Sequence, residues 1–193
     1  MPWEKSFDES DVIEQAMEVF WEKGYAATSI SDITDATGIK RGSLYNAFDG
    51  KDDLFLQSLL KYDSGRRKER LRQLEKIDDP RESISRFFDF AVQRALKDPH
   101  KKGCLLINTA LECEQHDDEV RKIVRDASRE MSAFFEKQIR RGQKLGVIPS
   151  TIEPRETGRA LYALLVGIIV LGRGTFGKTA LQQMAAQAAR LIS

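Results

Sequence analysis

The side chains of this chain with the clearest chemistry follow a glycine turn near the N-terminus. After Gly38 come basic, hydroxyl and amide groups at Lys40, Arg41, Ser43, Tyr45 and Asn46. Such groups can bind both the phosphates and the base edges of a DNA duplex. They stand at the expected start of a helix, where free backbone N–H groups and the helix dipole also favour a phosphate. The pattern therefore predicts a surface that binds double-stranded DNA.

Two short helices and the turn between them would position these side chains. Apolar residues recur at helical spacing, with Ile30, Ile33 and Ala36 in the first helix and Leu44 and Phe48 in the second. Gly38 supplies the turn, and a third helix begins at Lys51. This is the layout of a DNA-reading helix-turn-helix. The alternative is an ordinary pair of helices in which Tyr45 and Phe48 belong to the core.

The segment GYAATSISDITDATGIKRGSLYNAFDGKDDLF resembles the N-terminal domain of the TetR family of one-component transcriptional regulators. The resemblance implies that a first helix braces the motif and that the recognition helix begins near Arg41. It also implies that Lys51 meets the phosphate backbone from the next helix. Asp49-Gly50 departs from the proline and serine that the family often has there, so we expect a weaker cap on that helix and a negative charge near the DNA backbone.

These observations define the residues expected to contact an operator. Thr28 and Ser29 would cap the helix that begins at Ile30 and donate to phosphate. Arg41, Tyr45 and Asn46 would reach base edges. The full expected set is Thr28, Ser29, Lys40, Arg41, Gly42, Ser43, Tyr45, Asn46 and Lys51.

The rest of the chain is expected to be helical, which gives an all-α fold of about nine helices. Residues 1–52 would form a three-helix DNA-binding domain, and residues 53–193 a helical ligand-binding and dimerisation domain. The charged segment SGRRKERLRQLEK would link the two. Asp79, Pro80 and Glu82 predict the start of a helix. Further helices are expected over residues 104–114, 117–142, 158–171 and 179–191.

The segment over residues 160–171 is apolar at nearly every position, which indicates burial on more than one side. In the TetR family the last two helices form a four-helix dimer interface, so the resemblance implies a homodimer. A two-fold dimer would present recognition helices about 34 to 36 Å apart to a pseudo-palindrome. The alternative is a monomer in which this helix is core. The expected interface residues are Leu161, Leu164, Leu165, Gly167, Ile168 and Leu171.

Aromatic residues on several of the middle helices predict a largely apolar ligand cavity, although the same residues could form a solid core. In the family, an effector bound among these helices shifts the fourth helix and releases DNA; its identity here is unknown. Phe90 shares the aromatic pattern. The expected ligand residues are Tyr62, Arg66, Phe87, Phe88, Cys104, Asn108, Phe134, Phe135 and Tyr162.

Cys104 is a second candidate for receiving a signal. The segment GCLLINTALE resembles the sixth helix of a TetR subgroup, in some of whose members a cysteine in this Gly-Cys-Leu setting senses oxidants or electrophiles. Lys101, Lys102 and a nearby helix N-terminus would favour its thiolate. The alternative is a small residue that packs in the core.

Two other patterns suggest different chemistry. Residues Gly172 to Thr179, GRGTFGKT, fit a phosphate-binding loop, which would make the protein a nucleotide-binding enzyme, but only 14 residues follow Thr179. That is too short for the parallel strands such a loop needs. Cys113 and His116 stand three apart, and a metal would need a further ligand. We expect no catalytic site, no cofactor and no metal.

Composition sets weaker limits. The net charge of +1 is not a nucleic-acid signature, and residues 1–50 hold four Lys or Arg against ten Asp or Glu. We therefore expect few phosphate contacts and a shallow salt dependence of DNA binding. Two cysteines, no apolar N-terminal segment and no apolar run of 18 residues predict a soluble, cytoplasmic protein that does not bind a membrane.

Overall fold

The computed structural model describes residues 7–193, and within them all regular structure is helical. The first part holds α1 (Glu9–Lys23), α2 (Ile30–Thr37), α3 (Arg41–Ala47) and α4 (Gly50–Tyr62). A π-helical segment, η1 (Asp63–Lys68), continues α4 directly into α5 (Glu69–Glu75). There follow α6 (Pro80–Lys97), α7 (Leu105–Leu111), the 3-10 turn η2 (Cys113–Gln115), α8 (Asp118–Lys144), α9 (Pro154–Leu171) and α10 (Lys178–Arg190). Because α4, η1 and α5 form one run, the expected all-α fold of nine helices is confirmed for the described residues.

Side-chain caps explain where several helices begin. Asp8 accepts a hydrogen bond from the backbone N–H of Ser10, and Asp117 accepts one from Val120. Asp79 caps α6 in the same way, with Pro80 as its first residue, as the sequence predicts. Such caps satisfy backbone donors that the first turn leaves free.

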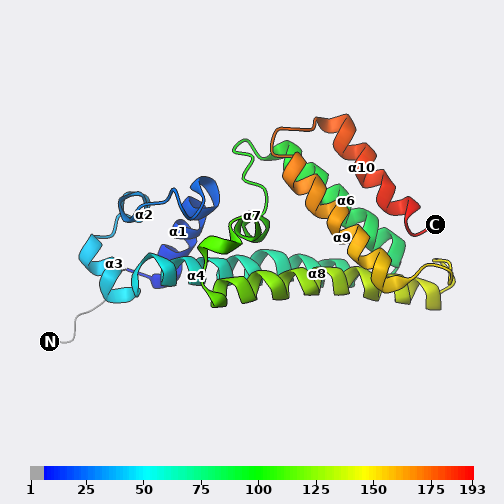
Figure 1. Cartoon of the computed structure of the whole chain (residues 1–193), viewed down its shortest axis with the longest axis horizontal. Helices are drawn as coiled ribbons and strands as arrows, with labels where there is room; N and C mark the ends of the chain where they lie inside the picture. Colours follow the sequence, from blue (N-terminus) through cyan, green and yellow to red (C-terminus); the bar gives the residue numbers. More distant parts are fainter. Residues whose placement is uncertain (1–6) are drawn as a thin grey trace.

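The helices form an elongated molecule (Figure 1), with α1, α2 and α3 at one end and α6, α9 and α10 at the other. The long helix α8 lies beside α4 and joins the two ends. One cluster of buried side chains, including Phe20, Leu44 and Leu54, lies under α1 to α4 and extends to α7 and the start of α8. A second cluster, including Phe135 and Leu161, lies between α6, α8, α9 and α10.

Helix α4 belongs to both ends of the molecule. Its side chains Leu54, Phe55 and Leu59 are buried in the first cluster, and Ser58 contacts the backbone of α1. Its last residue, Tyr62, reaches the middle of the molecule. The expected boundary between residues 52 and 53 therefore falls inside a continuous helix, α4.

The expected interface residues on α9 fall into two groups that differ in burial. Leu161, Leu165 and Ile168 are fully buried within the single chain, where they pack in the second cluster. These three are therefore core residues, which corrects the expectation that they lie at a dimer interface. Leu164, Gly167 and Leu171 remain partly exposed, although Leu164 also packs against the edge of the second cluster and Gly167 lies near Met184 of α10. Periodicity alone could not separate the two faces because both are apolar.

The segment Gly172 to Thr179 is a turn between two helices. It follows α9 instead of a strand, so the geometry of a phosphate-binding loop is absent from the described chain. Arg173 in this turn donates to the carbonyl oxygen of Lys101 and to the side-chain oxygen of Asn108. The segment thus fastens the end of α9 to the loop before α7, and the nucleotide-binding alternative loses its structural basis. Among residues 7–193, the helices are all too short or too polar to cross a membrane.

Candidate nucleic-acid interface and ligand cavity

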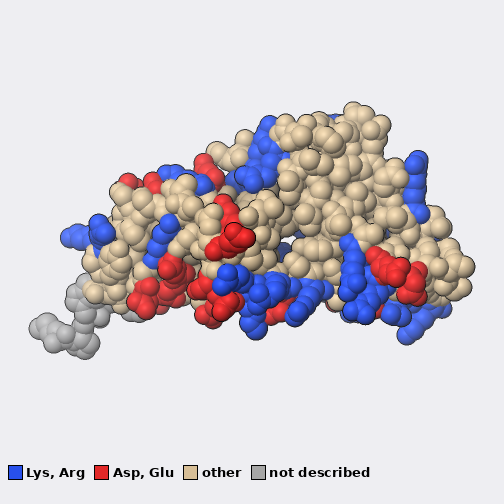
Figure 2. All heavy atoms as spheres, viewed as in Figure 1, with Lys and Arg blue, Asp and Glu red and all other residues tan. Residues whose placement is uncertain are grey.

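Helix α3 turns its polar side to solvent. Leu44 is fully buried against the first cluster, and this anchor fixes which face of α3 points outward. Tyr45 is 47% exposed, whereas Phe48 is buried, so only the second of these two aromatic residues is core. Lys40, Arg41, Gly42 and Asn46 are also exposed, and Ser43 is half-buried. Figure 2 shows Lys and Arg atoms protruding from the end of the molecule where α3 lies.

Arg41 and Tyr45 lie one turn apart on this face. The guanidinium carbon of Arg41 is 5.7 Å from the centre of the Tyr45 ring, within the range of a cation–π contact. The contact places two groups that can bind base edges side by side. The exposed face of α3 therefore has the residue types and the spacing of a recognition helix.

Ser29 and Thr28 play different parts before α2. The side chain of Ser29 accepts a hydrogen bond from the N–H of Asp32, whose carboxylate accepts in return from the N–H of Ser29, so the two form a capping box. Thr28 is only 2% exposed, and its hydroxyl donates to the carbonyl oxygen of Gly24 at 2.6 Å. Its donor is already used inside the protein, which corrects its expected role as a helix cap and phosphate donor.

Lys51 lies at the start of α4 above the ring of Tyr25, with Nζ 4.2 Å from the ring centre. The hydroxyl of Tyr25 donates to Asp52, and burial together with that carboxylate raises the pKa of Tyr25 to about 12. The side chain of Asp49 makes no cap hydrogen bond, which agrees with the weak cap expected there. Tyr25 thus holds Lys51 at the base of α3, although Asp52 places a negative charge close by.

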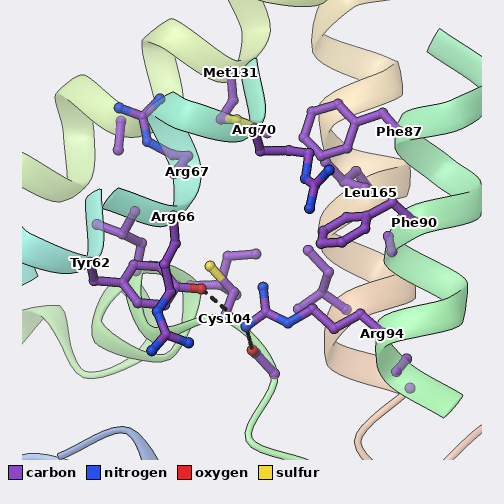
Figure 3. A pocket seen from close by; sticks show the side chains of 18 of the residues that line it. Tyr62, Arg66, Arg67, Arg70, Phe87, Phe90, Arg94, Cys104, Met131 and Leu165 are labelled. Carbon is purple, nitrogen blue, oxygen red and sulfur yellow. Dashed lines mark hydrogen bonds between the residues drawn. The ribbon is translucent and has the colours of Figure 1, made fainter. Parts of the chain in front are cut away.

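A cavity of about 400 Å³ lies in the middle of the molecule, lined by residues of α1, α4, η1, α5, α6, the loop before α7, α7, α8 and α9. Its volume suits a small organic molecule. Figure 3 shows side chains from these elements converging on it, and in Figure 2 the surface is hollowed near the middle of the molecule. Apolar side chains such as Phe87, Met131 and Leu165 form much of its wall.

The cavity includes only part of the expected ligand set. Tyr62, Arg66, Phe87, Cys104 and Tyr162 line it, as does Phe90. The remaining expected residues, Phe88, Phe134, Phe135 and Asn108, are not among its lining residues, which corrects their assignment. The three phenylalanines pack in the second cluster, where the Phe88 and Phe135 rings lie 5.8 Å apart. Asn108 instead donates to the carbonyl oxygen of Lys102 and accepts from Arg173.

Sequence reasoning missed most of the charge in the cavity. Arg67, Arg70 and Arg94 line it together with Arg66. Arg66 pairs with Glu14 and Glu18 of α1 at 3.2 and 2.6 Å and lies over the ring of Trp21. Arg67 pairs with Asp63 of η1 and Glu130 of α8. The arginines of the segment SGRRKERLRQLEK were the available signal for Arg66, Arg67 and Arg70, but from the sequence this segment is expected only to be a charged link between the two domains.

Cys104 lies against the polar wall of the cavity, beside Tyr62 and Arg94 (Figure 3). Arg94 donates through Nη2 to the hydroxyl of Tyr62 at 3.3 Å and to the carbonyl oxygen of Gly103 at 2.9 Å. Burial raises the pKa of Tyr62 above its ordinary value, so its hydroxyl stays protonated at neutral pH. Any reagent that enters the cavity therefore meets the thiol of Cys104 beside a fixed positive charge.

His116, which lies between η2 and α8, packs against aromatic residues of the first cluster. Its ring stacks on Phe55 with centres 5.0 Å apart and contacts Tyr25 at 4.9 Å. Its Nε2 is buried without a hydrogen-bond partner in the described structure. In residues 7–193 no group of three or more His, Cys, Asp or Glu residues could hold a metal ion, so Cys113 and His116 lack the further ligands they would need.

The structure combines an exposed helix with the features of a recognition helix and a cavity in the middle of the molecule. The continuous helix formed by α4, η1 and α5 connects the two. This combination defines the class of helix-turn-helix regulators with a separate ligand-binding part. Comparison with known sequences gives the family. Residues 12–57 match the profile described as bacterial regulatory proteins, tetR family, and residues 80–188 match that of the tetracyclin repressor-like C-terminal domain. The chain belongs to the TetR family and is a transcriptional regulator of that family.

Relatives of known name are regulators as well. The chain is 36% identical over 132 residues to the uncharacterized HTH-type transcriptional regulator YezE of Bacillus subtilis, a match that covers 68% of each protein. It is 23% identical over 188 residues to the HTH-type transcriptional repressor ComR of Escherichia coli, covering 97% of this chain and 90% of that protein.

Solved structures share the fold over nearly the whole chain. A cysteine mutant of the TetR family transcriptional regulator CifR, complexed with 26bp double-strand operator DNA, superposes with a TM-score of 0.84 at 26% identity and covers 97% of this chain and 98% of that one. The reduced form of NemR from E. coli has a TM-score of 0.86 at 16% identity, covering 95% of this chain and 96% of that one. The second likeness concerns the fold alone.

Proposed function

We propose that the protein is a repressor that binds a pseudo-palindromic operator as a homodimer and leaves it when an effector acts at the cavity. The observation that carries the proposal is the exposed polar face of α3, joined through α4 to a cavity of suitable size. The repressor name of ComR and the operator complex of CifR support it by analogy. A protein with this role works in the cytoplasm, where its operator lies.

The proposed DNA contacts are the exposed residues around α3. Arg41, Tyr45 and Asn46 would contact base edges, and Ser29 and Lys51 would contact phosphates. Lys40, Gly42 and Ser43 complete the surface. Residues 1–52 would supply these contacts, and residues 53–193 would supply the cavity and the dimer interface.

The outer face of α9 supports a dimer. Ala160, Ala163, Leu164, Gly167 and Leu171 recur at helical spacing on the side that the single chain leaves partly open. An apolar stripe of this kind on a helix surface is typical of an interface. A two-fold axis beside α9 would set two α3 helices on one duplex.

The run of α4, η1 and α5 supports the coupling between effector and DNA. It carries Lys51 at the end near α3 and Tyr62, Arg66 and Arg70 in the cavity wall. A π-helical segment such as η1 often marks a functional site. An effector that binds better to the released state than to the DNA-bound state would shift the population through this run.

Selection of bound sites from a random duplex library tests the proposal. We expect enriched sites with two-fold symmetry, and an absence of enrichment would contradict it. The selection is repeated with hydrogen peroxide for the wild type and for Cys104→Ser. Loss of enrichment in the wild type alone would assign the signal to the thiol, whereas equal enrichment in both would exclude oxidation of Cys104 by peroxide as the signal.

A further inference from the structure

The cavity contains more positive charge than its own carboxylates neutralise. Its charged lining residues are Arg66, Arg67, Arg70, Arg94, Lys101 and Arg173 against Glu69 and Asp98. Arg66 and Arg67 are neutralised by carboxylates of α1, η1 and α8. The remaining question is what Arg70 and Arg94 would bind.

Arg70 enters the cavity from α5 without a carboxylate partner among the described residues. Its Nη1 donates to the amide oxygen of Gln73 at 2.9 Å, and its guanidinium carbon lies 3.8 Å from the centre of the Phe90 ring. Its Nε is buried and has no hydrogen-bond acceptor anywhere in the described structure. A buried charged donor that lacks an acceptor destabilises the protein unless a ligand supplies one.

Arg94 enters the same cavity from α6. Its two hydrogen bonds go to a neutral hydroxyl and a backbone carbonyl, and its guanidinium carbon lies 4.8 Å from the centre of the Trp21 ring. Asp98 is a carboxylate that contributes to its charge environment. However, both oxygens of Asp98 already accept backbone N–H groups, those of His100 and Lys102.

The other lining residues indicate the chemistry of the uncharged part of the ligand. Figure 3 shows the guanidinium group of Arg70 beside the rings of Phe87 and Phe90, with Leu165 close to it, and the guanidinium group of Arg94 beside Tyr62 and Cys104. Both arginines line one cavity of about 400 Å³, so an anion bound by either one stays within the field of the other. The planar fork of a guanidinium matches a carboxylate, and an apolar body suits the aromatic and aliphatic wall.

We propose that the effector is a small organic carboxylate whose charged group binds at Arg70 and Arg94 and whose apolar body packs against Phe87 and Leu165. Its role as an effector rests on the proposed function, but the anion site itself does not. The site explains why two arginines lie in an interior position without carboxylate partners.

Calorimetric titration of the full chain at neutral pH tests the site with matched pairs of probes. Each pair is a carboxylate and its uncharged amide, for example naphthalene-2-carboxylate and the corresponding amide, in a panel of aryl and short alkyl acids. Since hydrogen bonds to a charged group are the stronger ones, at least one acid should bind about 10- to 100-fold more tightly than its amide. Equal affinity within every pair, or no binding by any acid, overturns the proposal.

Arg70→Gln should reduce the affinity for the acid to that for the amide. Arg72→Gln is the matched control, because Arg72 lies on the same helix with its side chain 62% exposed and paired to Glu69. Arg94→Gln should act as Arg70→Gln does. Arg94 also donates a hydrogen bond to the loop at Gly103. If the Arg94→Gln variant does not fold for that reason, the Arg70→Gln variant alone tests the anion site. Unchanged acid binding in Arg70→Gln overturns the assignment.

Operator binding measured with and without the acid separates this proposal from the proposed function. If the acid binds and the complex with DNA persists, the anion site stands and the proposed coupling fails. If the protein binds a symmetric operator but shows no preference for acid over amide, the repressor proposal stands and the anion site fails.

Discussion

Among single residues, Arg41 gives the sharpest prediction for DNA recognition. Arg41→Ala should weaken operator binding by about 1 to 3 kcal/mol and relax the preference at one base pair. The side chain is exposed, and the Tyr45 ring that it contacts is exposed as well, so thermal stability should stay close to that of the wild type. Binding titrations and a repeated site selection measure both effects.

Arg155→Ala is the matched control for Arg41→Ala. Arg155 is also exposed, but it lies at the start of α9, far along the chain from α3. The control should keep the affinity and the base preference of the wild type. An operator profile that is the same for Arg41→Ala and the control would remove Arg41 from the proposed readout.

Gly42 and Gly65 form a second matched pair. At both positions an added Cβ would meet no atom within 4 Å, and neither backbone is left-handed, so the fold itself does not require glycine there. Because alanine favours a helix over glycine by about 1 kcal/mol, both alanine variants should be at least as stable as the wild type. Only Gly42→Ala should lose operator affinity, since only Gly42 faces the proposed DNA surface. Thermal melts and DNA titrations measure the two effects, and equal affinity in both variants would show that Gly42 does not approach the duplex.

At the scale of helices, local signals were sufficient for the start of α6 and for the turn at Gly38. Asp79 and Pro80 act through the backbone groups next to them, so their effect can be read from sequence. The burial of Arg70 and Arg94 could not be predicted from the sequence, because it depends on the rings of Phe90 and Trp21 on other helices. The same limit applies to α9, where packing against α8 decides that Leu161 is buried and Leu164 is not.

The contact between His116 and α4 predicts a pH dependence of stability. Burial lowers the pKa of His116 below its ordinary value, although the carboxylates of Glu112, Asp117 and Asp52 oppose the shift. The unfolded chain therefore binds a proton as the pH falls through about 6.5, before the folded chain does. Stability should fall with pH below that point, by at most about 1.4 kcal/mol per pH unit.

Chemical denaturation of His116→Phe between pH 7.5 and 5.5 checks this prediction. Phenylalanine can keep the stack on Phe55 but cannot take up a proton, so this part of the pH dependence should disappear. His100→Phe is the control, since His100 is the second of the two histidines and is exposed. A slope that persists in His116→Phe and vanishes in the control would contradict the assignment.

At the scale of the whole molecule, the partly exposed apolar face of α9 should determine whether the protein is a dimer or a monomer. Leu164→Glu would place a charge in the proposed interface, where it could not be paired, and should convert the dimer into monomers. Operator affinity should fall with it, because one recognition helix alone makes half of the contacts. Light scattering after gel filtration and DNA titrations measure the two effects.

Leu111→Glu is the control for the same substitution. Leu111 is 69% exposed on α7, away from α9. This variant should remain dimeric and should bind the operator as the wild type does. A monomeric wild type, or a dimer that persists in Leu164→Glu, would place the interface elsewhere or exclude it.

The unbroken run from α4 through η1 to α5 also has a mechanical consequence. From the middle of η1 to Lys51 the backbone rises about 20 Å, at 1.5 Å per residue. A tilt of about 5° pivoting at η1 would therefore displace the far end by nearly 2 Å. Hydrogen bonds weaken steeply over less than that. A rotation too small to disturb the packing around η1 is thus enough to break contacts with DNA at the end of the helix that carries Lys51.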